Sequence, residues 1–193
     1  MRKNNIRLSF NSPVIITFVL ICLIVFGLNS LTGGWANRNL FGVYGASLLN
    51  IGTYIRVFGH VLGHANWPHY LGNMTLILVI GPMLEEKYGS ANIVKLIFIN
   101  AVVTGVFHMI FFPADILVGA SGIVFSFIML SSFTKTDDDS IPITVILVAF
   151  IYFGQELYQS IFIRDNISQI SHMLGGAVGL WAGQNRRRRH HCL

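Results

Sequence analysis

Long apolar runs that hold few charged residues constrain the fold of this chain more than any other feature of its sequence. The first run, residues 13–31, contains no charged side chain, and five later stretches have a similar composition. Only 11% of the 193 residues are charged, whereas soluble domains carry about 25%. The hydrocarbon core of a bilayer requires about 20 mostly apolar residues for a helix to cross it. The runs therefore exclude an ordinary soluble domain and indicate an integral membrane protein.

The spacing of the runs predicts an all-α bundle of six transmembrane helices. The expected spans are 13–31, 68–84, 91–112, 121–133, 141–161 and 167–183. The fourth is the shortest, and Pro68 predicts a late start for the second. The segment 32–67 is long for a loop, which is typical of a functional segment or of one in the membrane interface. With no internal repeat, we expect one membrane domain over residues 1–193.

The basic residues predict the orientation of this bundle. Six crossings place both termini on one side, and ten of the thirteen Lys and Arg residues belong to that side. They lie in the N-terminal segment 1–12, in the tail 185–193 and around the turns after the second and fourth helices. Because cytoplasmic loops carry an excess of Lys and Arg, we expect both termini in the cytoplasm. The first run is longer than the apolar part of a signal peptide and lacks a cleavage site, so we expect it to be retained.

Strongly polar side chains inside a membrane span are costly and mark functional sites, and four of those in the expected spans form a pattern. They are His69 and Asn73 in the second helix, Ser121 in the fourth and His172 in the sixth. These three helices all run from the outside inward, and each polar residue falls in the first turns of its helix. The four side chains are therefore expected to share one depth below the outer surface.

The types of residue in this layer favour nucleophilic hydrolysis. A serine hydroxyl becomes a nucleophile when a base such as a neutral imidazole takes its proton, which gives Ser121 and His172 complementary roles. Gly122 beside the serine, and Gly175 and Gly179 after the histidine, allow two helices to pack closely. Since no carboxylate is expected at this depth, the pattern predicts a dyad and not a triad.

The same layer also offers hydrogen-bond donors for a developing oxyanion. Gly119 and Gly122 let the chain turn sharply into the fourth helix, which leaves the backbone N–H of Ser121 unpaired at a helix N-terminus. The amide of Asn73 and a ring N–H of His69 add two further donors. Together they would form an oxyanion hole.

Three motifs occur in order on the second, fourth and sixth expected helices. They are His69-x-x-x-Asn73, Gly119-Ala120-Ser121-Gly122 and His172-x-x-Gly175-x-x-x-Gly179. In this order the motifs resemble the rhomboid family of intramembrane serine proteases. His64 upstream of His69, the turn from Glu85 to Gly89 and Arg56 in the long first loop also fit that family, although Ile55 stands where the family usually has Trp.

The resemblance implies a role for each site residue. Ser121 would be the nucleophile, His172 the general base and acid, and His69, Asn73 and the Ser121 backbone N–H the oxyanion donors. Phe125, one turn after the serine, occupies the position where the family places an aromatic ring against the histidine. The fifth span, with Phe150, Tyr152 and Phe153, would admit substrate from the side.

The implied partners are the lipid bilayer and single-span transmembrane proteins, which would be cleaved near the outer ends of their helices. The resemblance implies no cofactor and no metal. The basic residues form no patch with interleaved aromatic residues, so we expect no nucleic acid. The compact core favours a prokaryotic plasma membrane.

Three other functions compete with this interpretation. A catalytically silent rhomboid-like protein could bind membrane clients, although the dyad is intact. A transporter would commonly show two similar halves, which the sequence lacks. A metal centre could use His60, His64, His69 and His172, but the H-E-x-x-H pattern is absent. For His60, His64 and His108 we expect structural hydrogen bonds.

Overall fold

The computed structural model describes residues 11–133, 143–144, 146–148, 150–151, 154 and 166–190. Across these residues the regular structure is helical, and β structure is limited to an isolated bridge between Val43 and Leu117. In chain order the elements are α1 (Pro13–Leu31), the π-helix η1 (Asn37–Phe41), α2 (Ile51–Gly59), α3 (Trp67–Tyr88), α4 (Ser90–Phe111), α5 (Ser121–Ser131) and α7 (Asn166–His190). The predicted all-α class is confirmed.

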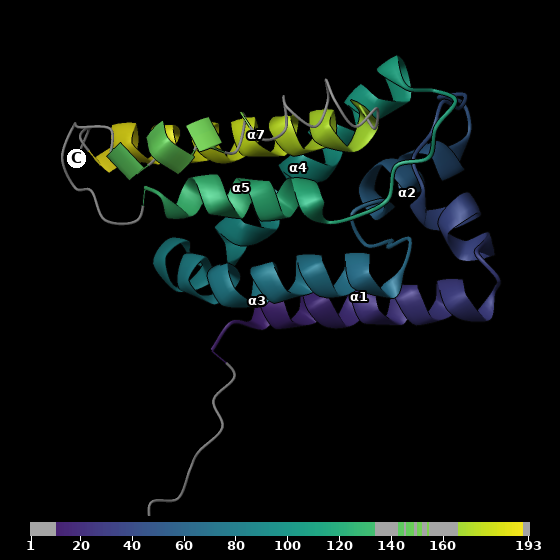
Figure 1. The fold of residues 1–193 in the computed structure, drawn as a ribbon, viewed down its shortest axis with the longest axis horizontal. Coiled ribbons are helices and arrows are strands. Elements are labelled where there is room, and N and C mark those ends of the chain that lie inside the picture. The colour runs from purple at the N-terminus through teal and green to yellow at the C-terminus, as the bar shows by residue number, and fades with distance from the viewer. Residues whose placement is uncertain are drawn as a thin grey trace, which may run out of the picture.

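Helix α5 is the central element of the bundle. It packs most extensively against α7 and also contacts α3 and α4, and Figure 1 shows it between α3 and α7. All residues from Gly122 to Leu130 except Ile128 are buried. The first residue of α5, Ser121, is thus held by a helix that other helices surround.

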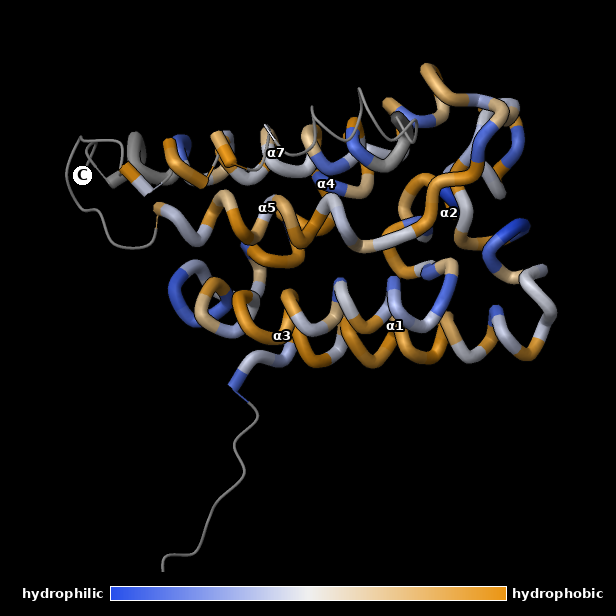
Figure 2. Tube along the Cα trace, in the orientation of Figure 1, coloured by the Kyte–Doolittle hydropathy of each residue, from blue (hydrophilic) through white to orange (hydrophobic). Residues whose placement is uncertain are grey.

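Two of the described helices, α1 and α4, are long and apolar enough to cross a membrane. Figure 2 shows apolar residues around most of α1 instead of along one face. Its outward side chains include Ile24 and Leu31, which are 69% and 88% exposed. A helix that is apolar all round suits an apolar surrounding. The count of six spans and the cytoplasmic termini stay predictions, and most of the expected span 141–161 lies outside the described residues.

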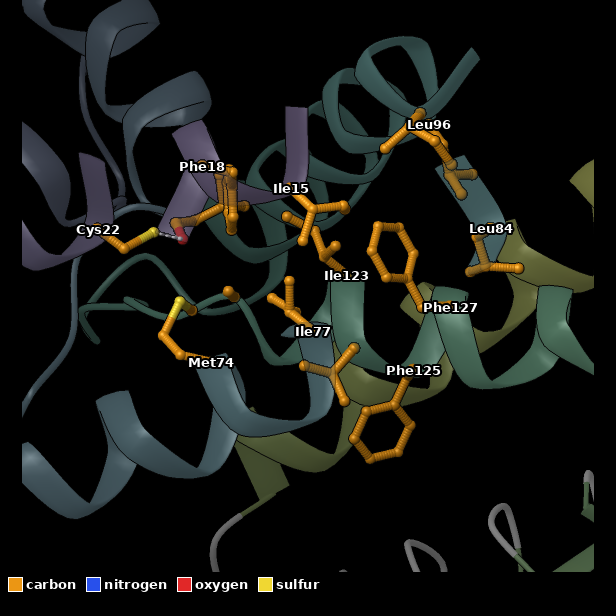
Figure 3. Packing of buried hydrophobic residues seen from close by; sticks show 14 of the residues in the cluster. Ile15, Phe18, Cys22, Met74, Ile77, Leu84, Leu96, Ile123, Phe125 and Phe127 are labelled. Carbon is orange, nitrogen blue, oxygen red and sulfur yellow. Dashed lines mark hydrogen bonds between the residues drawn. The ribbon is translucent and has the colours of Figure 1, made fainter. Parts of the chain in front are cut away.

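The hydrophobic core joins α1, α3 and α5. Ile15 of α1, Ile77 of α3 and Phe127 of α5 belong to one buried cluster, in which each is no more than 1% exposed. Figure 3 shows Phe125 pointing away from Phe127. Residues two apart on a helix lie on nearly opposite faces. Phe125 and Phe127 therefore point to different sides of α5, and both belong to the buried cluster.

A buried carboxylate ties the start of α1 to the turn between α3 and α4. Glu85 is 4% exposed, and its two oxygens accept the backbone N–H groups of Val14 and Ile15, each at 3.0 Å. The hydroxyl of Ser90 donates to the same carboxylate at 2.7 Å. The first N–H groups of a helix have no intrahelical acceptor, and the helix dipole favours a negative charge beside them. Glu85 therefore caps α1 from another part of the chain.

The start of α3 lies within one residue of the expected start at Pro68. The helix begins at Trp67, with Pro68 in its first turn and the Asn66 side chain accepting the His69 N–H at 2.9 Å. Pro68 is compatible with this position because a first-turn proline lacks only an N–H that would have had no acceptor within the helix. At their other ends α3 and α7 run beyond the expected limits, whereas α5 stops at Ser131.

The segment 32–67 is not a simple loop, because it contains η1 and α2. Asn50 caps α2, since its side chain accepts the N–H of Gly52 at 2.8 Å. The apolar side chains of Ile51, Ile55 and Phe58 on α2 are exposed. An exposed apolar face on a short helix is typical of an element that lies in a membrane interface.

Candidate active site

The turn that leads into α5 has a conformation suited to glycine. Gly119 has a φ of +135°, and its N–H donates to the carbonyl of His60 at 2.9 Å. A Cβ atom at this position would lie 2.8 Å from Cε1 and 2.9 Å from Nε2 of His69. Both the backbone angle and the space therefore call for glycine. The turn and the His69 ring are in direct contact just before Ser121.

Asn73 lies one helical turn after His69 and faces the same turn. Its Nδ2 atom is 3.8 Å from the Cβ position of Gly119. This atom is buried, and among the described residues it has no hydrogen-bond partner. Buried amide groups normally find a partner, so Asn73 presents an available donor beside the start of α5.

Helices α5 and α7 touch through their backbones. A Cβ atom on Gly175 would lie 2.6 Å from Cα of Gly122, and one on Gly179 would lie 2.7 Å from Cα of Ser126. Gly175 and Gly179 are four residues apart in α7, and Gly122 and Ser126 are four residues apart in α5. The two residues of each helix therefore fall on one face of it. Small residues at such a spacing let two helices approach closely. The predicted close contact between these helices is present.

The imidazole of His172 lies against α5. Its ring stacks on Phe125, with the ring centroids 4.3 Å apart and the planes at 18°. Phe125 is four residues after Ser121, hence on the same helical face. The carbonyl of Ser171 lies 3.5 Å from the Cβ position of Gly122. These contacts bring His172 to the first turn of α5, where Ser121 is found.

His64 supports this arrangement from outside it. Its ring meets the His69 ring edge-on, with the centroids 5.2 Å apart. Its Nδ1 lies 3.2 Å from the carbonyl of Leu62. Burial is the main reason why the pKa of His64 is lowered to about 4, with a smaller contribution from His69. His64 is therefore neutral at pH 7.

The expected structural hydrogen bonds of His60 and His108 are confirmed. His60 Nδ1 lies 2.9 Å from the carbonyl of Val57, and His108 Nε2 lies 3.0 Å from that of Asp115. Burial is the main reason why the pKa of His60 is lowered to about 4, and nearby His108 adds to that effect. The other ring nitrogen of His60, Nε2, lies 3.1 Å from Oγ1 of Thr104. The Thr104 hydroxyl donates to the carbonyl of Asn100 at 2.7 Å.

The structure thus brings together the segments that carry every residue expected in the site. His69 and Asn73 contact the Gly119 turn, and Phe125 and the glycines of α7 place His172 beside α5. The chemical roles of these residues stay predictions. In the described part of the chain, no three His, Cys, Asp or Glu side chains could hold a metal ion. The expected gate residues Tyr152 and Phe153 lie outside the described residues.

Sequence reasoning missed two polar residues that lie directly behind the site. Asn100 of α4 and Ser126 of α5 are each 0% exposed. They are joined by a hydrogen bond from Asn100 Nδ2 to Ser126 Oγ. An asparagine within an apolar span is itself a signal of function or of interhelical bonding, so Asn100 could have been found.

Comparisons with known proteins point in the same direction. The rhomboid domain model matches residues 51–189. Mouse (Mus musculus) rhomboid-related protein 2 is 29% identical over 141 residues, which cover 66% of this chain and 46% of that protein. Rhomboid protease GluP of Bacillus subtilis (strain 168) is 27% identical over 192 residues, which cover 92% of this chain and 36% of that protein. The chain spans less than half the length of each of these relatives. It belongs to the rhomboid family of integral membrane proteins.

Proposed function

We propose that this protein is an intramembrane serine endopeptidase that cleaves transmembrane segments of other membrane proteins near the outer face of the bilayer. One observation carries the proposal. The stacking of His172 on Phe125, together with the backbone contact between Gly175 and Gly122, places an imidazole beside the helix terminus that begins with Ser121. A hydroxyl and a base in this relation form the core of a serine nucleophile.

In the proposed reaction, Ser121 Oγ attacks the carbonyl carbon of the scissile peptide bond while His172 takes the hydroxyl proton. The tetrahedral intermediate collapses as His172 gives that proton to the leaving amine, which breaks the C–N bond. A water molecule then attacks the acyl-enzyme, again with His172 as base, and releases the carboxylate product and free Ser121. Such acid–base catalysis contributes about 10²- to 10⁴-fold in rate.

The negative charge on the intermediate would be stabilised where α3 meets the start of α5. The backbone N–H of Ser121 has no intrahelical acceptor at a helix N-terminus. Asn73 supplies a buried Nδ2 that is not used by another described residue, and His69 lies against the adjoining Gly119. Loss of one oxyanion donor typically lowers kcat by about 10²- to 10³-fold. We therefore expect Asn73→Ala to reduce turnover by about that factor.

Phe125 has a positioning role in this proposal. Its ring covers one face of the imidazole at 4.3 Å, which limits the rotation of His172. The orientation that a carboxylate gives to histidine in a triad would come here from an aromatic contact. A dyad is then sufficient.

The six-span topology with cytoplasmic termini is part of the same proposal, because it puts the starts of α3, α5 and α7 near the outer surface. Substrates would be single-span proteins whose helix unwinds easily near that surface, with small residues at the cleavage point. The relatives named above come from a bacterium and a mouse, and a prokaryotic plasma membrane stays a prediction.

Labelling with a fluorophosphonate serine probe in detergent or lipid tests the proposal. We expect the wild type to label and both Ser121→Ala and His172→Ala to stay unlabelled. Ser30→Ala is the matched control, because its hydroxyl donates to the carbonyl of Phe26 within α1, and it should label like the wild type.

Two outcomes would contradict the proposal. A folded wild type that neither labels nor cleaves a transmembrane substrate would favour a client-binding protein. Activity that disappears in chelator and survives Ser121→Ala would favour a metal-dependent reaction.

A further inference from the structure

We propose that Asn100 and Ser126 are positioning residues that fix His172 relative to Ser121. The inference rests on the proposed function. It concerns two residues that would not touch the substrate and would act by holding the main chain near His172 and Ser121 in position. Neither residue belongs to the three motifs. Both are fully buried in the contact between α4, α5 and α7.

The first link joins α5 to α7. Ser126 Oγ donates to the carbonyl of Gly175 at 2.6 Å. Gly175 is three residues after His172, about one turn along the same helix. The backbone contact between Gly122 and Gly175 is non-directional and sets only how near the helices are. The hydrogen bond is directional, so it also restricts how α7 rotates and slides.

The second link brings in α4. Because a carbonyl only accepts, the Ser126 proton is committed to Gly175, and the Ser126 oxygen is left to accept from Asn100 Nδ2. Asn100 Oδ1 lies 2.7 Å from the Cβ position of Gly122. Asn100 therefore contacts two successive turns of α5, at Gly122 and at Ser126.

A third link reaches the turn before Ser121. Thr104 lies one turn after Asn100 in α4 and is hydrogen-bonded to Nε2 of His60. The carbonyl of His60 accepts the N–H of Gly119 at 2.9 Å. Together these contacts form a buried bridge through His60, Thr104, Asn100 and Ser126. The bridge begins at Gly119, two residues before Ser121, and ends at Gly175, three residues after His172.

The geometry explains why such a bridge affects catalysis. Side-chain atoms about 6 Å from a helix axis move by about 1 Å when the helix rotates by about 10°. A displacement of this size between reacting groups can cost about 100-fold in rate. Hydrogen bonds in a low-dielectric interior are strong enough to resist it.

The kinetic test compares four purified variants on one transmembrane substrate. We expect Ser126→Ala to lower kcat by about 10- to 100-fold with little change in KM, since the lost bond moves the base and not the substrate-binding surface. Asn100→Ala, which leaves the bond to Gly175, should have a smaller effect. The double variant should match Ser126→Ala, because both residues act through that bond. Ser132→Ala is the control, since Ser132 follows the last residue of α5 and its hydroxyl donates to the carbonyl of Ile128 in the last turn of that helix.

A spectroscopic test does not depend on turnover. In ¹H–¹³C spectra of histidine-labelled protein, the ring protons of His172, assigned with His172→Gln, should be displaced by the ring current of Phe125. We expect Ser126→Ala to reduce this displacement and Ser132→Ala to preserve it. Unchanged His172 resonances together with wild-type kcat in folded Ser126→Ala would overturn the inference.

The two proposals fail in different ways. Cleavage by Ser121→Ala would refute the proposed function, whatever Ser126→Ala does. Loss of activity in Ser121→Ala with full activity in Ser126→Ala would refute only the positioning role. A kcat loss in Ser126→Ala that merely follows its folded fraction would also refute it.

Discussion

Replacing Gly175 by alanine tests the contact that sets the distance between α5 and α7. The added Cβ would lie 2.6 Å from Cα of Gly122, whereas ordinary contact begins at 3.4 Å. The carbonyl oxygen of Gly122 is also in the way. Both obstacles are backbone atoms, which cannot change rotamer, so α7 must move away from α5 by about 1 Å in a closely packed interior.

Two magnitudes follow from this displacement. Overpacking of a well-packed contact costs about 1–3 kcal/mol of stability. A shift of about 1 Å between nucleophile and base lowers the rate by about 100-fold. We therefore expect Gly175→Ala to show a modestly lower unfolding midpoint and a much slower reaction with a fluorophosphonate probe.

The matched control is the same substitution at Gly27 in α1, where a Cβ would meet nothing within 4 Å. Alanine is favoured over glycine in a helix by about 1 kcal/mol, so Gly27→Ala should be as stable as the wild type or more so, with an unchanged labelling rate. The assay is the second-order labelling rate, measured beside the thermal unfolding midpoint. A Gly175→Ala protein that labels at the wild-type rate would refute the reasoning.

Three further predictions use other contacts of the structure. The folded-state pKa values of His60 and His64 are lowered to about 4 from 6.5, so on acidification the unfolded chain binds protons at these residues before the folded chain does. The free energy of unfolding should therefore be highest above pH 6.5, fall as the pH drops to about 4 and then level off. Thermal unfolding measured across this pH range tests the prediction, and a flat profile would contradict it. Phe125→Ala removes a ring contact worth about 0.5–1.5 kcal/mol, so kcat should fall by up to about 10-fold while Phe125→Tyr stays active; equal rates for both would contradict the role of the ring. Glu85→Ala leaves two N–H groups of α1 without their acceptor and should cost about 3 kcal/mol of stability. The unfolding midpoint should fall in this variant and be partly restored in Glu85→Gln. An unchanged midpoint in both variants would show that α1 does not need this cap.

The helices α1, α3, α4, α5 and α7 and their order could be predicted from the sequence because each lies in an apolar run. The bounds of α1 were predicted to the residue, since a proline begins the run and Thr32 and two glycines follow it. The bounds of α3 were less accurate at the C-terminal end, because Glu85 looks like the end of an apolar run. In the structure its charge is satisfied by the start of α1, a contact between distant segments that no local pattern reveals.

The segment that contains α2 illustrates a different limit. A helix of nine residues is too short for the spacing of its apolar residues to distinguish it from a loop, and its cap at Asn50 is equally typical of a turn. The pairing of Val43 with Leu117, which holds the turn before Ser121, joins residues far apart in the chain. Such pairings depend on tertiary structure and are not visible in local sequence.

Much of the candidate site could be inferred from the polar residues alone, because polar groups in apolar spans are rare. The sequence identified His69, Asn73, Ser121 and His172 and the glycines around them. The bridge through Asn100 and Ser126 was not found, because serine in a transmembrane helix is common. Its importance depends on which carbonyl its hydroxyl meets, and that is a property of the assembled bundle.

The contact between Gly122 and Gly175 has a mechanical consequence. No side chain lies between the two main chains at this point, so changes of side-chain rotamer, which adjust the spacing at other helix contacts, cannot adjust the spacing here. Any fluctuation in the gap must be a rigid displacement of an entire helix, which is a slower and larger motion. The spacing of α5 and α7 at Gly122 and Gly175 is therefore fixed, and the flexibility needed to admit a bulky polypeptide must lie in other parts of the bundle.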